Sequence, residues 1–107
     1  MSILLVDRAQ FLEGVRVLDG MVKRKQQAKA IFTFRDGLLT MKIANTVVDV
    51  PATGEWSGTA KMSAQVLFAA TNPPPLTDTV TLKVEGSRMS IGRISTHCEW
   101  VESRAAD

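Results

Sequence analysis

Two stretches of the sequence begin alike and are followed by the same succession of patterns. Arg8-Ala9-Gln10-Phe11-Leu12 and Ser63-Ala64-Gln65-Val66-Leu67 each open a helical pattern, with a strand pattern before it and alternating segments after it. A repeated order of elements is typical of a duplicated unit, so we expect two halves, residues 1–53 and 54–107, each ordered β-α-β-β-β. Neither half closes its apolar sheet face alone. The sequence therefore predicts an α+β fold with two helices side by side on one antiparallel sheet, related by approximate twofold symmetry.

The first half begins with an apolar strand at Ile3–Val6 and a helix whose N-cap is Asp7. The apolar residues of this helix recur at helical spacing. They are Phe11, Val15, Leu18 and Val22, with Leu12 and Met21 beside them. Gly14 lowers the helix propensity by about 1 kcal/mol relative to Ala. The cations Lys23, Arg24 and Lys25 suit the last turn, where the helix dipole is negative.

After this helix the apolar residues recur at every second position. Ala30, Phe32 and Phe34 share one face of a predicted strand, and Asp36-Gly37 predicts a tight hairpin. The returning strand carries Leu39, Met41 and Ile43 on one face. A third strand is predicted over Thr46–Val50, and we expect Pro51 and Gly54 to end it.

The second half repeats this order. A strand is predicted over Trp56–Met62, followed by an N-cap at Ser63 and a short helix through Ala70. The next hairpin places Val80, Leu82 and Val84 inward and turns at Glu85-Gly86-Ser87. Its returning strand is predicted over Arg88–Ile94, with a shift of phase near Gly92. A last strand carries Thr96, Cys98 and Trp100.

The length and composition are those of one globular domain. The chain has 107 residues, of which 45% are hydrophobic and 22% charged, so we expect one packed core. Thirteen Lys and Arg against eleven Asp and Glu give a net charge of +2. A charge this small does not by itself indicate a nucleic-acid partner.

The sequence also predicts a cytoplasmic protein without a membrane partner. The single cysteine, Cys98, cannot form an intramolecular disulfide, and the N-terminal residues lack the basic start of a secretory signal. No apolar run approaches the roughly 18 residues that a membrane-spanning helix needs.

In the order of its elements the chain resembles one module of the DNA sliding clamps, and is most similar to the bacterial polymerase beta clamp. The resemblance is carried by the start of the first helix, by two hairpins and by the midpoint of the chain. These segments are Asp7-Arg8-x-x-Phe11-Leu12-x-x-Val15, residues 30–41, residues 58–67 and residues 81–91. It covers nearly the whole chain as a pattern of elements and apolar positions.

The resemblance implies a ring whose paired helices face a central hole and touch DNA phosphates without reading sequence. It therefore implies three kinds of partner, namely further copies of this chain, double-stranded DNA and a replication or repair protein. The candidate phosphate contacts are Arg8, Arg16, Lys23, Arg24 and Lys25. The same cations also fit an ordinary solvated helix face, and Glu13 shares that face.

Two features depart from the clamp pattern. The second helix, Ser63–Thr71, has no charged residue, whereas clamp helices carry a basic lining. The chain also holds one module where clamps complete a ring from six, so six copies of it are needed. An assembly module that has the clamp-like fold but no DNA role is the alternative function.

The remaining motifs point away from catalysis. The sequence lacks the nucleophile-base pairs, phosphate loops and CxxC motifs of enzymes, and we expect neither a cofactor nor a metal. His97 and Cys98 are adjacent on a predicted strand and so point to opposite faces. Trp56, Phe68 and Pro73-Pro74-Pro75 with Leu76 either form an exposed apolar patch or end the helix and stiffen its loop.

Overall fold

The computed structural model describes residues 2–21, 28–71 and 78–102. Within these residues the chain has the predicted α+β fold, with nine strands in one antiparallel sheet and two helices. The elements are β1 (Ser2–Asp7), α1 (Arg8–Met21), β2 (Lys29–Arg35), β3 (Leu38–Ile43), β4 (Thr46–Glu55), β5 (Gly58–Ser63), α2 (Ala64–Ala70), β6 (Thr79–Glu85), β7 (Arg88–Ile91), β8 (Ile94–His97) and β9 (Glu99–Glu102). In the sheet, neighbouring strands follow the order β8-β7-β6-β1-β4-β3-β2-β5-β9.

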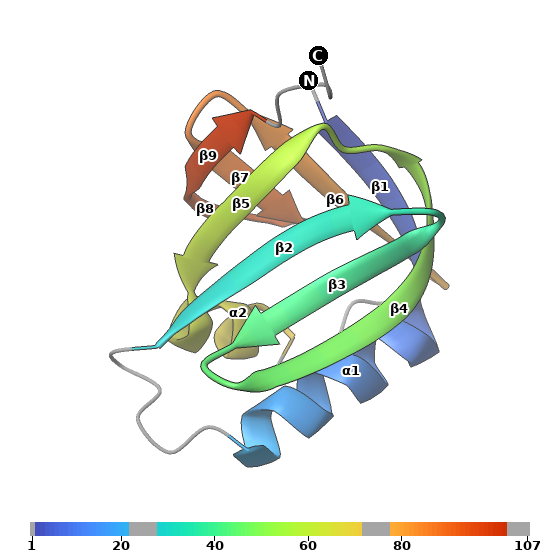
Figure 1. The fold of residues 1–107 in the computed structure, drawn as a ribbon, viewed down its shortest axis with the longest axis vertical. Helices are drawn as coiled ribbons and strands as arrows, with labels where there is room; N and C mark the ends of the chain where they lie inside the picture. The colour runs from blue at the N-terminus through green and yellow to red at the C-terminus, as the bar shows by residue number, and fades with distance from the viewer. Residues whose placement is uncertain (1, 22–27, 72–77, 103–107) are drawn as a thin grey trace.

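The sheet curves around the core, and both helices lie on its inner side (Figure 1). α1 runs across β4 and also contacts β1, β3 and β6, whereas α2 contacts β5 and β2. Buried and exposed residues alternate along the strands, because successive side chains point to opposite faces of a sheet. The largest fully buried side chains are Phe11, Phe32, Leu4, Leu18, Leu39, Met41, Ile43, Met62, Leu67, Leu82, Met89 and Val6.

The predicted start of α1 is confirmed, and most of its apolar stripe is buried. The backbone N–H of Gln10 donates to Asp7 Oδ2 at 3.1 Å, which is the predicted N-cap. Phe11, Val15 and Leu18 are buried and Leu12 is half-buried. Met21, which was expected beside the stripe, is 63% exposed. Val22 lies outside the described residues.

Gly14 has a packing role that its helix propensity does not indicate. It is buried where α1 crosses the β3–β4 hairpin. A Cβ atom at this position would lie 3.0 Å from Met41 Cε, 3.0 Å from Val48 Cγ1 and 3.1 Å from Val50 Cγ2. The missing side chain therefore lets the helix approach the sheet closely.

β4 is longer than the sequence predicts. We expected Pro51 and Gly54 to end it, but the strand continues to Glu55. Its first part, up to Pro51, pairs with β3, and its second part, from Ala52, pairs with β1. At Gly54 the φ angle is +134°, and a Cβ there would lie 2.2 Å from the carbonyl oxygen of Ile3. Gly54 therefore lets the backbone of β4 lie close against β1, its second neighbour.

The second half contains several smaller corrections. Its returning strand, predicted over Arg88–Ile94, ends at Ile91, and Ile94 begins β8. β5 begins at Gly58 rather than Trp56, and Ser63 stands at the N-cap of α2 without a side-chain hydrogen bond to the helix. The last strand is broken at Cys98 into β8 and β9. The predicted turns at Asp36-Gly37 and Gly86 are confirmed by their positive φ angles, and so is the change of phase at Gly92.

The first residue of each helix makes a matching backbone hydrogen bond. Arg8 N–H donates to the Asp78 carbonyl at 2.8 Å, and Ala64 N–H donates to the Ala28 carbonyl at 3.0 Å. Asp78 and Ala28 each come directly before the strand that pairs with the strand leading into the helix, β6 beside β1 and β2 beside β5. Both helices are therefore tied to the sheet at equivalent places.

A second matching pair of hydrogen bonds lies beyond the hairpin turns. Ala52 N–H donates to the Gly37 carbonyl at 2.9 Å, and Cys98 N–H donates to the Ser87 carbonyl at 2.8 Å. Ala52 is where β4 leaves β3 for β1, and Cys98 is where the chain leaves β7 for β5. In each half the chain therefore changes its strand partner beside the turn of an earlier hairpin, β2–β3 in the first half and β6–β7 in the second.

Candidate functional site

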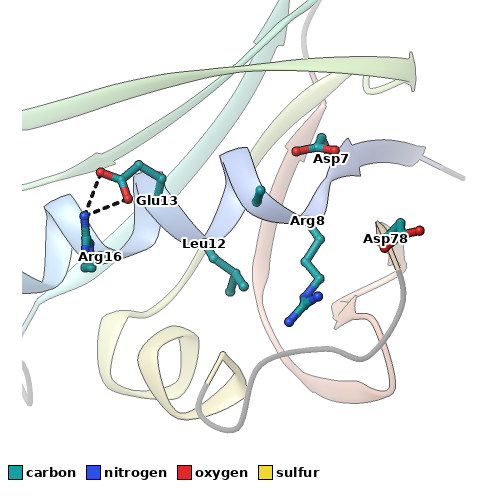
Figure 2. Close-up of a pocket in the computed structure, with 7 residues that line it drawn as sticks. Asp7, Arg8, Leu12, Glu13, Arg16 and Asp78 are labelled. Carbon is teal, nitrogen blue, oxygen red and sulfur yellow. Dashed lines mark hydrogen bonds and ion pairs between the residues drawn. The ribbon is translucent and has the colours of Figure 1, made fainter.

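A shallow groove of about 650 Å³ lies along the start of α1. It is lined by Asp7, Arg8, Ala9, Leu12, Glu13, Arg16 and Asp78. Figure 2 shows that the side chains of Arg8 and Leu12 project from the same side of the helix, while Asp7 and Asp78 flank its first turn. The groove brings together two of the cations predicted to contact phosphate, Arg8 and Arg16.

Arg8 is half-buried at the base of this groove. Its Nε atom is buried and has no hydrogen-bond partner among the residues that the structure describes. An unsatisfied buried donor of this kind costs about 1–3 kcal/mol. The guanidinium group therefore gains free energy from any acceptor that enters the groove, but Asp7 and Asp78 reduce the attraction for an anion.

Arg16 is already paired. Its Nη2 atom lies 2.8 Å from Glu13 Oε2 and donates to Glu13 Oε1 at 3.0 Å. The two side chains are 78% and 60% exposed, and an exposed pair at this helical spacing contributes about 0.2–0.5 kcal/mol. A phosphate can displace the Glu13 carboxylate at a small cost in free energy. The Arg16–Glu13 pair has no net charge, however, so it adds little attraction for a phosphate.

The described part of the helix side of the molecule carries no excess of positive charge. Its groove carries three carboxylates against two guanidinium groups. On α2 the exposed residues are Gln65 and Ala69, which carry no charge. The other predicted phosphate contacts, Lys23, Arg24 and Lys25, lie outside the described residues.

A second groove, of about 370 Å³, lies between α1 and β4 and is mainly apolar. Its apolar lining includes Gly14 and Val17 on the helix side and Val48, Val50 and Pro51 on the strand side. Val17 is 44% exposed there. Sequence reasoning missed this groove, although a glycine on the apolar side of a helix is a signal of close packing.

This groove lies along an unpaired strand edge. Among the described residues, Thr46–Pro51 of β4 pair only with β3, and β8 pairs only with β7. Each of these strands follows a two-residue hairpin turn, so alternate residues direct their N–H and C=O groups away from the hairpin partner. On β4 these include Val47 and Asp49, and on β8 they are Ser95 and His97. The sheet therefore offers open edges at the first part of β4 and at β8, and β9, which pairs only with β5 among the described residues, is a further edge strand.

The other candidate residues have structural roles. Trp56 is buried and its Nε1 donates to the Phe32 carbonyl at 3.3 Å, so it does not form the exposed patch considered from the sequence. It packs edge-on against Trp100, with ring centroids 5.4 Å apart. Phe68 is half-buried, and the residues 73–76 lie outside the described part.

The side chains of His97 and Cys98 point to opposite faces, as predicted, although the strand itself ends at His97. His97 is exposed and Cys98 is buried, so the two side chains are on opposite faces. Burial raises the pKa of the Cys98 thiol above its usual value, which makes it a poor nucleophile. No group of three or more His, Cys, Asp or Glu residues within the described ranges is placed to hold a metal ion.

Comparison with known proteins adds no family. No protein-family model matches the chain, and no curated protein has a significantly similar sequence. No helix in the described part of the chain is long and apolar enough to cross a membrane.

Proposed function

We propose that this chain is a non-catalytic, sliding-clamp-like module that associates with copies of itself and contacts the DNA backbone without reading its sequence. The observation that carries the proposal is the repeated strand pairing. The pairings β1–β6, β2–β3, β3–β4 and β4–β1 correspond in order to β5–β2, β6–β7, β7–β8 and β9–β5. This supports a duplicated β-α-β-β-β unit, which is the arrangement that the resemblance to clamps implies.

The helix starts support the same duplication. Asp7 and Ser63 hold the two N-cap positions, and counting from them pairs Phe11 with Leu67, both fully buried. Leu12 then matches Phe68, and both are half-buried. The likeness between Arg8–Leu12 and Ser63–Leu67 seen in the sequence is therefore displaced by one residue from this alignment.

The open edges supply a means of association. β4 and β8 are counterparts in the two halves, so one copy can add its β8 beside the β4 of the next and continue the sheet. Such a contact joins different surfaces of the two copies, and a contact of this type forms a ring when its rotation closes. The apolar groove beside β4 and the 43% exposed Ile94 of β8 add surface to bury.

The test of association is solution mass measured by light scattering over a range of protein concentrations. The natural chain is expected to form a closed oligomer, with six copies as the clamp-like number. The variant Ser95→Pro is expected to lower the mass to that of a monomer, because proline removes the outward N–H of β8. Ser95→Ala keeps that N–H and is the matched control. A natural chain that stays monomeric at all concentrations rules out the ring.

DNA contact is tested separately, by fluorescence anisotropy with a duplex of about 30 base pairs. Phosphate contacts release counterions, so the logarithm of the binding constant is expected to fall with that of the salt concentration by about 0.9 per contact. Replacing Lys23, Arg24 and Lys25 by Gln should reduce this slope by nearly three. Gln at Lys83, Arg88 and Arg93 removes the same charge elsewhere and is the control.

A second candidate function is an assembly module that has the clamp-like fold and binds a protein, such as a replication or repair factor, without a DNA role. The near-neutral groove on α1 and the uncharged surface of α2 favour it. An oligomer that forms normally but binds no duplex at low salt would support this function over the first.

A further inference from the structure

Three lysines surround one isoleucine on the outer face of the sheet. Lys42 of β3 and Lys61 of β5 stand directly opposite Ile31 of β2, one on each side. Lys29 lies two residues from Ile31 on β2, and therefore on the same face. The lysines are exposed and Ile31 is half-buried. We call Lys29, Lys42, Lys61 and Ile31 the lysine patch.

The patch is not neutralised by the described part of the chain. None of its three lysines forms an ion pair with a described residue, whereas Lys83 on the other part of the outer face lies 3.5 Å from Glu85. Glu99 stands opposite Lys61 in the sheet, but the two charged groups are not within ion-pair distance. The ammonium groups are therefore available to an external anion.

The fold does not require these charges. β6 beside β1 corresponds to β2 beside β5. At the place of Ile31 this strand has Thr81, and Leu5 of β1 stands beside Thr81. On its other side the N–H of Gly92 donates to the Thr81 carbonyl at 2.9 Å. The first residue of that strand is Thr79, in the place of Lys29. The same positions are thus occupied by uncharged residues.

Protection of a sheet edge does not explain the lysines either. Lysine is common on edge strands, where it discourages pairing with other chains, and is depleted in strands generally. β3, β2 and β5 are interior strands with a neighbour on each side. Lys42 and Lys61 are two strand spacings apart, or about 10 Å between Cα atoms, which is about one Debye length. Their charges repel slightly, and an anion would relieve this.

We propose that the lysine patch binds an acidic segment of a partner protein that also carries apolar side chains. Ile31 lies at the centre of the patch, and Val47, which is 53% exposed, stands beside Lys42 in the same row across the strands. An apolar centre suits a peptide better than a phosphate backbone. Two turns of helix span about 10.8 Å, so carboxylates about seven residues apart, with a leucine midway, match Lys42, Ile31 and Lys61.

This surface goes beyond the clamp-like function and does not depend on ring formation or DNA. It is tested with a fluorescein-labelled helical peptide that carries glutamates at this spacing and leucine between them. A second peptide, with glutamine for each glutamate, measures the contribution of charge. Binding of the natural chain to each peptide is followed by anisotropy, and a duplex DNA of about 30 base pairs is the third probe.

The deciding variant combines Lys29→Gln, Lys42→Gln and Lys61→Gln. It is expected to bind the acidic peptide at least about tenfold more weakly, because complementary charges at the interface are lost. Its thermal midpoint should equal or exceed that of the natural chain, since the lysines repel one another. The matched control combines Lys83→Gln, Arg88→Gln and Arg93→Gln, and should change the affinity by less than about twofold.

Three results would overturn the proposal. The first is equal affinity of the natural chain for the glutamate and glutamine peptides, or no binding of either. The second is equal weakening by both triple variants, which indicates an effect of net charge. In the third, the patch variant loses duplex binding while the peptide fails to bind, which assigns this face to nucleic acid.

Discussion

The two halves of the molecule use the same strand pairings but different residues where a strand changes neighbours. In residues 2–55 one continuous strand, β4, passes from β3 to β1, and Gly54 accepts a backbone conformation that other residues avoid. In residues 58–102 the corresponding chain is broken at Cys98, and Trp100 stands where the first half has Gly54. The same pairing scheme is thus reached by two local solutions.

The helices differ in the same way. α1 has 14 residues and lies closely against β4 through Gly14. α2 has seven residues and carries Ala70 at the matching position. Because α1 is longer than α2 and lies closer to the sheet, more of the helix–sheet packing is in the first half. Substitutions in the first half are therefore expected to cost more stability.

Gly54→Ala is expected to have the largest effect. Its Cβ would lie 2.2 Å from the Ile3 carbonyl oxygen, and the φ of +134° is strained for alanine. We expect a loss of about 3 kcal/mol in the free energy of unfolding, measured with urea. Gly86→Ala is the control, because it has a positive φ but open space around it, and should cost about 1 kcal/mol. Equal losses would show that crowding at β1 is unimportant.

Gly14→Val should be the next most damaging change. The new side chain must displace Met41, Val48 and Val50, and we expect about 2 kcal/mol of destabilisation. Gly20→Ala, in open space on the same helix, should instead stabilise the chain by up to about 1 kcal/mol. The close packing of α1 is contradicted if both substitutions stabilise the protein in urea titrations.

Cys98→Ala makes the two halves more alike, since Ala52 holds the corresponding place. The buried sulfur is lost, so a small cavity should reduce stability by about 1 kcal/mol. Thermal unfolding in reducing buffer measures this change. Ala52→Ser places a hydroxyl group at the matching buried position of the first half. It tests whether that half tolerates a polar group less well than the second half tolerates the Cys98 thiol. A gain in stability from Cys98→Ala would mean that the thiol is strained.

Glu102 gives the smallest expected effect, and it depends on pH. Hydrogen bonds from Ser57 and Trp100 lower the pKa of this carboxyl group in the folded chain. Its contribution to stability is therefore present above the unfolded-chain pKa and is lost as the pH falls through the lower, folded-chain value. Glu102→Gln should slightly lower the stability at neutral pH and flatten this acid dependence. An unchanged acid dependence in urea titrations would exclude this role.

Much of the fold was predictable because it rests on local patterns. Alternation located the hairpins, and Asp36-Gly37 fixed one turn by the positive φ of both residues. The continuation of β4 past Pro51 was not predictable, because it depends on a neighbour, β1, that is far away in the sequence. Likewise the role of Gly14 depends on side chains of β3 and β4. Helix propensity alone predicts that this glycine only weakens the helix.

The candidate site was less predictable than the fold. A helical projection placed Arg16 on the solvent side correctly, and Glu13 beside it. It did not indicate that Asp78, from the start of another strand, would join the groove at Arg8. The lysine patch was not found either, because Lys29, Lys42 and Lys61 come together only through the pairing of three strands.

The central claim is that copies of this chain associate through the open edges of β4 and β8. Amide hydrogen exchange followed by NMR tests it most directly, at the backbone N–H groups of Asp49 and Ser95. We predict that both amides exchange rapidly in dilute protein and become protected together as the concentration rises, because they form hydrogen bonds between copies. Rapid exchange of both amides at every concentration would contradict the claim.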